Sequence, residues 1–207
     1  MPTLIASGGP VIWLILIAAA TAAVVFIERV LFCHRSQINS AEFLNGVRTV
    51  IKRGNVVEAI SICDATPGPV ARLVKTAILN RDHGRERVRE SLEEAGLSEV
   101  PRLEQRLDLL ATIAQLAPLL GLLGTVLGFI KTFTTLQSQA LYANSNMMSE
   151  GVGQALICCA AGLAVAIPIH AGYNYLVSRV NAIVTDMERA ANEIVNIVSE
   201  NGRAKSA

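Results

Sequence analysis

Three stretches of the chain are apolar and free of charge. They cover residues 11–27, 109–130 and 151–176, and none of them contains Lys, Arg, Asp or Glu. A helix needs about 20 apolar residues to cross a hydrocarbon core of about 30 Å. The second and third stretches reach this length, and the first reaches it when extended to about residue 32. The pattern predicts an all-α membrane protein with transmembrane helices at 11–32, 108–132 and 151–177.

The segment between the first two spans also has helical periodicity. In residues 41–52 the apolar side chains recur on one face, and Gly54-Asn55 interrupts the pattern. We expect two further helices at 56–63 and 70–79, separated by a turn that contains two prolines. Pro101 is expected to begin a helix at its first turn. This helix is expected to run without a break into the second span.

The third span is predicted to continue as one helix to about residue 200, because no Pro or Gly interrupts the chain between Gly172 and that point. Apolar residues recur along this extension. Two interpretations are open for this stripe, namely packing against the chain's own polar-domain helices and self-assembly with other copies. Its members are Val180, Ile183, Val184, Met187, Ile194 and Val195.

Lys and Arg are unevenly distributed and predict the orientation. Residues 1–10 and 133–150 contain none, whereas 33–107 contains twelve. Short loops that are rich in Lys and Arg usually lie on the cytoplasmic side of the membrane. We therefore expect 1–10 and 133–150 outside, with a helical domain at 33–107 and a helix and tail at 178–207 in the cytoplasm. No basic residue precedes the first span, so it is expected to be a retained helix rather than a signal peptide.

The composition of the chain argues against several classes of function. The chain is 52% hydrophobic and 17% charged, and its net charge of +1 gives no basic field for nucleic acid. Its four cysteines lack metal or redox spacing, and no nucleophile–base pair or phosphate-binding loop is present, so we expect neither a cofactor nor an enzyme. The charge-free stretches contain no acid, and a proton relay in a membrane generally needs one. A partner would have to supply it.

Small residues recur on one face of the second and third spans. Such residues allow helix backbones to approach closely in a membrane, and Gly124-x-x-x-Gly128 is one such motif. Two interpretations are open, namely packing of the two spans within one subunit and a cavity shared between subunits, for which Thr125 is the candidate because its hydroxyl both donates and accepts. The stripes are Ala114, Pro118, Gly121, Thr125, Gly128 and Thr132, and Gly151, Ala155, Cys159, Gly162, Ala166 and Tyr173.

Four segments resemble the MotA/TolQ/ExbB proton channel family. The run APLLGLLGTVLG at 117–128 is similar to its first signature, and GQALICCAAGLAVAIP at 153–168, followed by Tyr173-Asn174, is similar to its second. TPGPVAR at 66–72 and GGPV at 8–11 resemble other parts of the ExbB sequence. The short layout with a single internal domain favours an ExbB/TolQ-like subunit over a flagellar stator.

The resemblance implies a homopentameric ring in the bacterial inner membrane with a periplasmic N-terminus. It implies that the ring surrounds an ExbD/TolR-like single-span partner whose membrane Asp carries the proton, and that it serves a TonB-like protein or, as in TolQ, envelope maintenance. The first signature's pore threonine matches Thr125. Helix packing is expected at Pro118, Gly121, Gly124, Gly128, Gly162 and Pro168.

Two positions depart from the family pattern. The second signature normally reads Glu-Ala-Leu-x-x-Thr, and this chain has Gln154 and Cys159 at the first and last of these positions. The first change removes a negative charge, and the second replaces a hydroxyl by a thiol that forms weaker hydrogen bonds. The pore assignment is therefore Thr125, Cys159 and Gln154. Two functions are open, a conducting motor subunit and a structural ring that conducts little.

Overall fold

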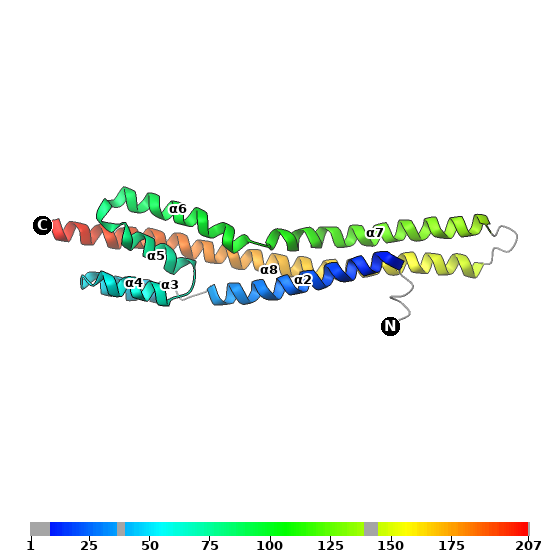
Figure 1. Ribbon diagram of the computed structural model, residues 1–207, viewed down its shortest axis with the longest axis horizontal. Coiled ribbons are helices and arrows are strands. Elements are labelled where there is room, and N and C mark those ends of the chain that lie inside the picture. The colour runs from blue at the N-terminus through cyan, green and yellow to red at the C-terminus, as the bar shows by residue number, and fades with distance from the viewer. Residues whose placement is uncertain (1–8, 37–39, 139–144, 207) are drawn as a thin grey trace. The chain divides into compact units, whose positions relative to one another are not determined.

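The computed structural model describes residues 9–36, 40–138 and 145–206, and these form helices joined by short turns (Figure 1). The elements are α2 (Gly9–Ser36), α3 (Ser40–Lys52), α4 (Val56–Ala65), α5 (Pro69–Leu79), the 3-10 helix η1 (Arg81–His83), α6 (Arg85–Glu104), α7 (Leu107–Ser138) and α8 (Ser145–Ser206). Within this part of the chain, three helical stretches are long and apolar enough to cross a membrane. The predicted fold class, all-α with three candidate membrane helices, is confirmed.

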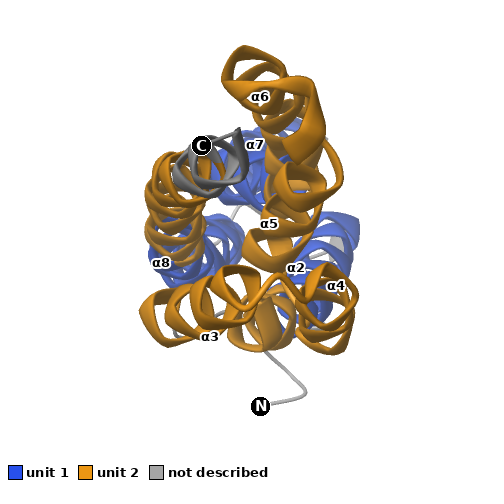
Figure 2. Ribbon diagram, turned by 90° about the vertical axis from the view of Figure 1, so that its left-hand side faces the viewer, with its two compact units in different colours: residues 1–28, 106–175 blue, residues 29–105, 176–207 orange. Residues whose placement is uncertain are grey.

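The chain divides into two compact units, drawn in blue and orange in Figure 2. The first contains Met1–Glu28 and Arg106–Tyr175, and the second contains Arg29–Gln105 and Leu176–Ala207. Helices α2 and α8 each contribute residues to both units. The first unit therefore consists of the apolar helices, and the second contains the segment that the sequence assigns to a polar helical domain.

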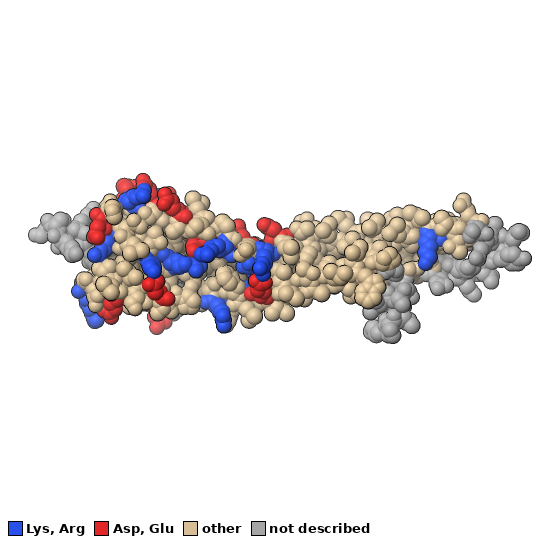
Figure 3. Space-filling view, viewed as in Figure 1, with Lys and Arg blue, Asp and Glu red and all other residues tan. Residues whose placement is uncertain are grey.

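The first unit exposes large apolar side chains in place of polar ones. Trp13 and Ile17 on α2 are each 62% exposed, and Phe133 on α7 is 66% exposed. Charged side chains are almost absent from the visible face of this unit (Figure 3). Among its described side chains only four are charged, namely Glu28, Arg106, Asp108 and Lys131. A helix that is apolar on all sides belongs in a membrane or a large core.

The second unit has a buried apolar core of its own. Helices α3, α4 and α5 match the predictions at 41–52, 56–63 and 70–79, which are confirmed. Gly54 turns the chain at a φ of +77°, and the Asn55 side chain then accepts a hydrogen bond from the Glu58 N–H to cap α4. The core is made of side chains with less than 2% exposure, among them Val47, Val70, Val74, Ile78 and Val88.

Four of the six members of the apolar stripe of the C-terminal segment are buried inside this unit, and Val184 and Val195 are half-buried. Val180, Ile183, Met187 and Ile194 are each at most 3% exposed. This burial agrees with the first of the two interpretations, in which the stripe packs against the chain's own helices. Helix α8 runs without interruption from Ser145 to Ser206, so the predicted continuous helix is confirmed.

The prediction of one helix from Pro101 into the second span is wrong. Pro101 lies inside α6, which ends at Glu104, and α7 begins at Leu107. Between them Arg106 adopts a left-handed φ of +65°, which is uncommon for a residue other than glycine.

A side chain that is distant in sequence contacts the end of α6 at this break. Arg29, only 4% exposed, lies 3.5 Å from both the Arg102 carbonyl oxygen and the Gln105 side-chain oxygen. Its guanidinium therefore donates long hydrogen bonds to the end of α6, where carbonyl groups have lost their partners within the helix. This contact spans 73 residues of sequence and is invisible to a local pattern.

The connection between the second and third spans is shorter than predicted. Helix α7 extends to Ser138 and α8 begins at Ser145, so helical turns occupy much of the predicted 133–150 segment. The remaining part, 139–144, and most of the predicted external segment 1–10 lie outside the described residues.

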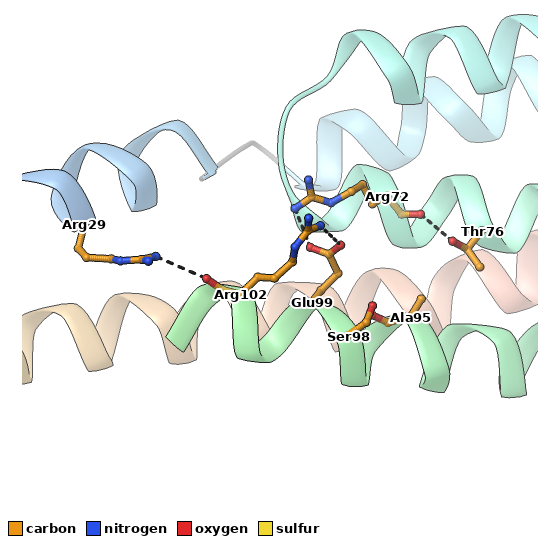
Figure 4. Close-up of polar contacts among 7 residues, drawn as sticks. All are labelled: Arg29, Arg72, Thr76, Ala95, Ser98, Glu99 and Arg102. Atoms are coloured by element: carbon orange, nitrogen blue, oxygen red, sulfur yellow. Dashed lines mark hydrogen bonds and ion pairs between the residues drawn. The ribbon is translucent and has the colours of Figure 1, made fainter. Parts of the chain in front are cut away.

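Two arginines share one buried carboxylate in the second unit. Glu99 lies between the guanidinium groups of Arg72 at 2.6 Å and Arg102 at 3.3 Å (Figure 4). The Glu99 side chain is 8% exposed, whereas those of Arg72 and Arg102 are 51% and 66% exposed. The carboxylate links α5 to the last turns of α6.

Glu99→Gln is expected to lower the free energy of unfolding by about 2 kcal/mol. Removing one partner of a fully buried ion pair costs about 3–5 kcal/mol, and the expected loss is smaller here because both arginines are largely solvated. The matched control is Glu93→Gln, since Glu93 pairs with Arg89 at 3.2 Å but is 67% exposed; it should cost less than about 0.5 kcal/mol. Denaturant titration of the purified variants measures both, and equal losses would contradict the account.

Cys63 is a buried thiol in the same unit, at the end of α4. Burial raises its pKa from 9.0 to about 11, Asp64 acts in the same direction, and Lys75 opposes them. A raised pKa lowers the thiolate fraction at pH 8 roughly a hundredfold relative to an ordinary thiol, and the thiolate is the form that reacts. We expect iodoacetamide to modify Cys63 at least a hundredfold more slowly in the folded chain than in the unfolded chain at pH 8. Peptide mass spectrometry measures both rates, and equal rates would exclude this environment.

Candidate functional site

Helices α7 and α8 pack antiparallel along a line of small residues within the first unit. Gly128 meets Ala155, Gly124 meets Cys158, and Gly121 meets Gly162, so the contact proceeds in opposite directions along the two helices. The closest approach of the two helix backbones is at Gly162. A Cβ atom there would lie 2.7 Å from the Ala117 carbonyl oxygen and 2.9 Å from the Gly121 Cα. Only glycine fits this contact without a backbone shift.

The same contact line continues toward the ends of the helices that are joined by 139–144. Thr132 is 8% exposed, and its hydroxyl donates to the Gly128 carbonyl oxygen at 2.8 Å. A Cβ atom on Gly151 would clash with the Thr132 hydroxyl oxygen. Gly151 is therefore the residue that allows α8 to pass the Thr132 side chain.

The side chains of Thr125 and Cys159 border this contact line, although the Cys159 backbone contacts Gly121. Gly124 and Cys158, one residue before each of them, occupy the contact itself, and Cys158 is only 2% exposed. Thr125 and Cys159 are half-buried. The Thr125 hydroxyl donates to the Leu122 carbonyl oxygen at 2.6 Å, which leaves its lone pairs able to accept a further hydrogen bond.

Helix α2 packs against one side of the α7–α8 pair. A Cβ on Gly124 would lie 3.4 Å from Val11, and one on Gly172 would lie 2.8 Å from the Phe26 ring. Thr125 follows Gly124 by about 100° of helical rotation. Around the axis of α7, Gly121 and Gly128 lie between these two residues, so Thr125 is on the flank of the contact line that faces away from Gly124 and α2. Cys159 and Gly172 are thirteen residues apart, which places them on roughly opposite sides of α8.

We call the flank of α7 and α8 opposite to α2 the uncovered face, and it includes Thr125 and Cys159. Their levels along the helices are similar, since Gly121 contacts the Cys159 backbone and Gly124 contacts Cys158. The uncovered face thus carries a hydroxyl and a thiol at one depth. Both groups form hydrogen bonds without carrying charge.

Gln154 lies elsewhere. It precedes Cys159 by five residues, or about 140° of rotation, and it precedes Gly172 by eighteen, which is about five full turns. It is half-buried and lies on the α2 side of α8. The structure therefore groups Thr125 with Cys159 and places Gln154 apart from them. Pro118 is half-buried at the border of the contact line, and Pro168 is exposed.

Two residues of the contact line were missed by the sequence interpretation. Ala117 and Cys158 lie in the contact, whereas the predicted stripes name Pro118 and Cys159, their neighbours. The burial of Cys33, Cys63 and Cys158 agrees with cysteines acting as small apolar residues. Within the described part of the chain no group of three or more His, Cys, Asp and Glu residues could hold a metal ion.

These features define an integral membrane protein whose central element is a tightly packed helix pair with a weakly polar uncovered face. The model of the MotA/TolQ/ExbB proton channel family matches residues 65–189. This match covers α5, α6 and α7 and most of α8, and the chain belongs to this family. It is a family of transport channels and motor subunits.

Three curated relatives illustrate the similarity. A putative biopolymer transport protein ExbB homolog of Methanothermobacter thermautotrophicus is 28% identical over 183 residues, covering 88% of this chain and 64% of the relative. The Tol-Pal system protein TolQ of Haemophilus influenzae is 40% identical over 108 residues, covering 52% and 47%. The biopolymer transport protein ExbB of Neisseria gonorrhoeae is 25% identical over 206 residues, covering 91% and 92%. The chain thus spans less than two thirds of the length of the first two.

Proposed function

We propose that several copies of this chain, five by family resemblance, form a ring in the bacterial inner membrane around an ExbD/TolR-like single-span partner. The ring would be the stator-like subunit of a proton-driven motor. The observation that carries this proposal is the uncovered face, which bears Thr125 and Cys159 on a helix pair whose apolar stretches, 109–130 and 151–176, contain no acid. The partner's membrane Asp would supply the proton-carrying group.

In this arrangement the uncovered faces of neighbouring copies surround the partner. The Thr125 hydroxyl accepts a hydrogen bond from water or from the protonated partner carboxyl, and the Cys159 thiol does so more weakly. Proton transfer to and from the partner carboxylate would drive rotation of ring and partner relative to each other. Gln154, on the α2 side of α8, would contribute near the external end rather than inside the cavity.

The orientation follows the positive-inside rule. The N-terminus and the 133–150 segment would face the periplasm, while 33–107 and the C-terminal segment 178–207 would lie in the cytoplasm. The proposed output is energy for TonB-dependent transport across the outer membrane. A TolQ-like role in envelope maintenance is the alternative output, and the identity of the partner's periplasmic domain separates the two.

A ring that conducts little is the second candidate function. It is favoured by Gln154 and Cys159, because the family pattern has a carboxylate and a hydroxyl at these positions. The double variant Gln154→Glu/Cys159→Thr tests it through proton flux in vesicles that contain the ring and its partner. An increase in proton flux of more than about tenfold would favour a native ring that conducts weakly. An increase of less than about twofold would favour a native ring that already conducts well.

Native mass spectrometry of the complex tests the assembly itself. The chain is expressed together with its candidate single-span partner and extracted in lipid nanodiscs or mild detergent. We expect one species with five copies of this chain and at least one partner. A monomer in both environments, with no single-span protein bound, would remove the basis of the proposal.

A further inference from the structure

His170 is an exposed imidazole near the end of the third apolar stretch that is expected to face the cytoplasm. Apart from tyrosine and cysteine it is the one ionisable residue between 151 and 176, and it is exposed on α8. The centroid of its ring lies 6.4 Å from that of Tyr173. Ionisable side chains in membrane segments usually face a protein interior or a water-filled cavity, because hydrocarbon solvates them poorly. The exposure of His170 therefore needs a polar environment outside the single chain.

The helical phase of His170 identifies the side on which that environment lies. His170 precedes Gly172 by two residues, or about 200° of rotation, and Gly172 is where Phe26 of α2 contacts α8. His170 follows Cys159 by eleven residues, which is close to three full turns. It thus lies on the uncovered face, in line with Cys159 and away from α2.

His170 and Cys159 lie at different levels along the axis of α8. Eleven residues correspond to about 16 Å along the helix axis, toward the end that is expected to face the cytoplasm. The residues between them on this side of α8 include the exposed Leu163, which cannot carry a proton. Direct transfer from the Cys159 level to His170 is too long, so water must fill the intervening distance.

We propose that His170 is the proton-transfer residue at the inner end of the uncovered face. This inference rests on the proposed function of the ring and adds a residue that the family signatures do not include. An imidazole can accept a proton on one nitrogen and release one from the other. His170 would take a proton on one nitrogen from the water in the cavity and release one from the other nitrogen to cytoplasmic water.

The test compares two isosteric variants in vesicles that contain the ring and its partner. The Gln side chain of His170→Gln cannot exchange a proton. The Glu side chain of His170→Glu has the same size as Gln and can exchange one. We expect proton flux to fall at least tenfold in His170→Gln and to stay above half of the wild-type flux in His170→Glu. His34→Gln and His83→Gln are the controls, because both histidines are exposed outside the apolar stretches, and each should change flux less than twofold.

Each outcome decides the inference. Equal flux in the Gln and Glu variants, whether both high or both low, overturns the role of His170. Flux that falls in Thr125→Val and persists in His170→Gln overturns His170 while leaving the proposed function intact. A wild-type complex that conducts no protons overturns both.

Thiol labelling gives a readout that does not depend on conduction. The His170→Cys variant of the assembled complex is treated with a charged, membrane-impermeant thiol reagent from the cytoplasmic side, and the modified peptide is identified by mass spectrometry. We expect labelling at position 170 and none in an Ile17→Cys control, whose position on α2 is 62% exposed and lies outside the uncovered face. Absence of labelling at 170 would place His170 against lipid and contradict the inference.

Discussion

Gly162→Ala is expected to destabilise the helix pair by about 3 kcal/mol or more. The added methyl group would lie 2.7 Å from the Ala117 carbonyl oxygen and 2.9 Å from the Gly121 Cα, and both are backbone atoms. Overpacking of a well-packed core usually costs about 1–3 kcal/mol, and a clash with backbone on both sides lies at the upper end because neither atom can rotate away. Helices α7 and α8 would have to separate.

The matched control is Gly153→Ala on the same helix. A Cβ atom on Gly153 would have nothing within 4 Å, so this variant introduces the same methyl group without a clash. Both replacements raise helix propensity equally, and Gly153→Ala should therefore be neutral or slightly stabilising. The free energy of unfolding, measured by titration with SDS in mixed micelles, compares the two. Equal stabilities would show that α7 and α8 do not pack through Gly162.

Thr125→Val is expected to reduce partner-dependent proton flux at least tenfold with little loss of stability. Valine keeps the size and branching of threonine but replaces the hydroxyl by a methyl group, so the uncovered face loses its donor and acceptor at this depth. The lost bond to the Leu122 carbonyl oxygen is local to one helical turn. The effect should therefore appear in flux rather than in the free energy of unfolding.

Thr134→Val provides a closely matched control. The Thr134 hydroxyl also donates to the carbonyl oxygen three residues earlier, that of Lys131, at 2.9 Å. Thr134 follows Thr125 by nine residues, which places it on the opposite side of α7. Flux in this variant should stay within twofold of the wild type. A similar loss in both variants would mean that the uncovered face has no special role.

The apolar helices were predictable from sequence because their signal is local and one-dimensional. A run of about 20 uncharged residues has few explanations other than a span. Helices α3, α4 and α5 were predictable for a related reason, since Gly54-Asn55 and the Thr66–Pro69 turn interrupt the periodicity where the chain turns. In each case the residues that determine the element lie inside it or directly beside it.

The break between α6 and α7 was not predictable because its partner is remote. Nothing between Pro101 and Leu110 marks a helix end, and Arg106 carries the left-handed φ that a sequence would assign to glycine. The contact of Arg29 with the end of α6 comes from α2, 73 residues away. Long-range side-chain capping of this kind leaves no periodic trace.

Most members of the predicted small-residue stripes, such as Gly121 and Gly162, lie in the observed contact, but a few were predicted one position away from it. A line through Pro118, Gly121 and Thr125 and a line through Ala117, Gly121 and Gly124 have comparable helical spacing, so periodicity cannot choose between them. The neighbouring helix decides, and it selects the second line. This shift separates the roles, because it leaves Thr125 on the uncovered face while Gly124 packs against α8.

Proton flux with and without the single-span partner tests the central claim most directly. The ring and its partner are reconstituted together in vesicles with an imposed proton gradient, and a pH-sensitive dye reports flux for the ring alone, the complex, and the complex whose partner carries Asn in place of its membrane Asp. The account predicts flux in the wild-type complex only. Equal flux through the ring alone would contradict it, because this chain would then conduct without a partner's acid.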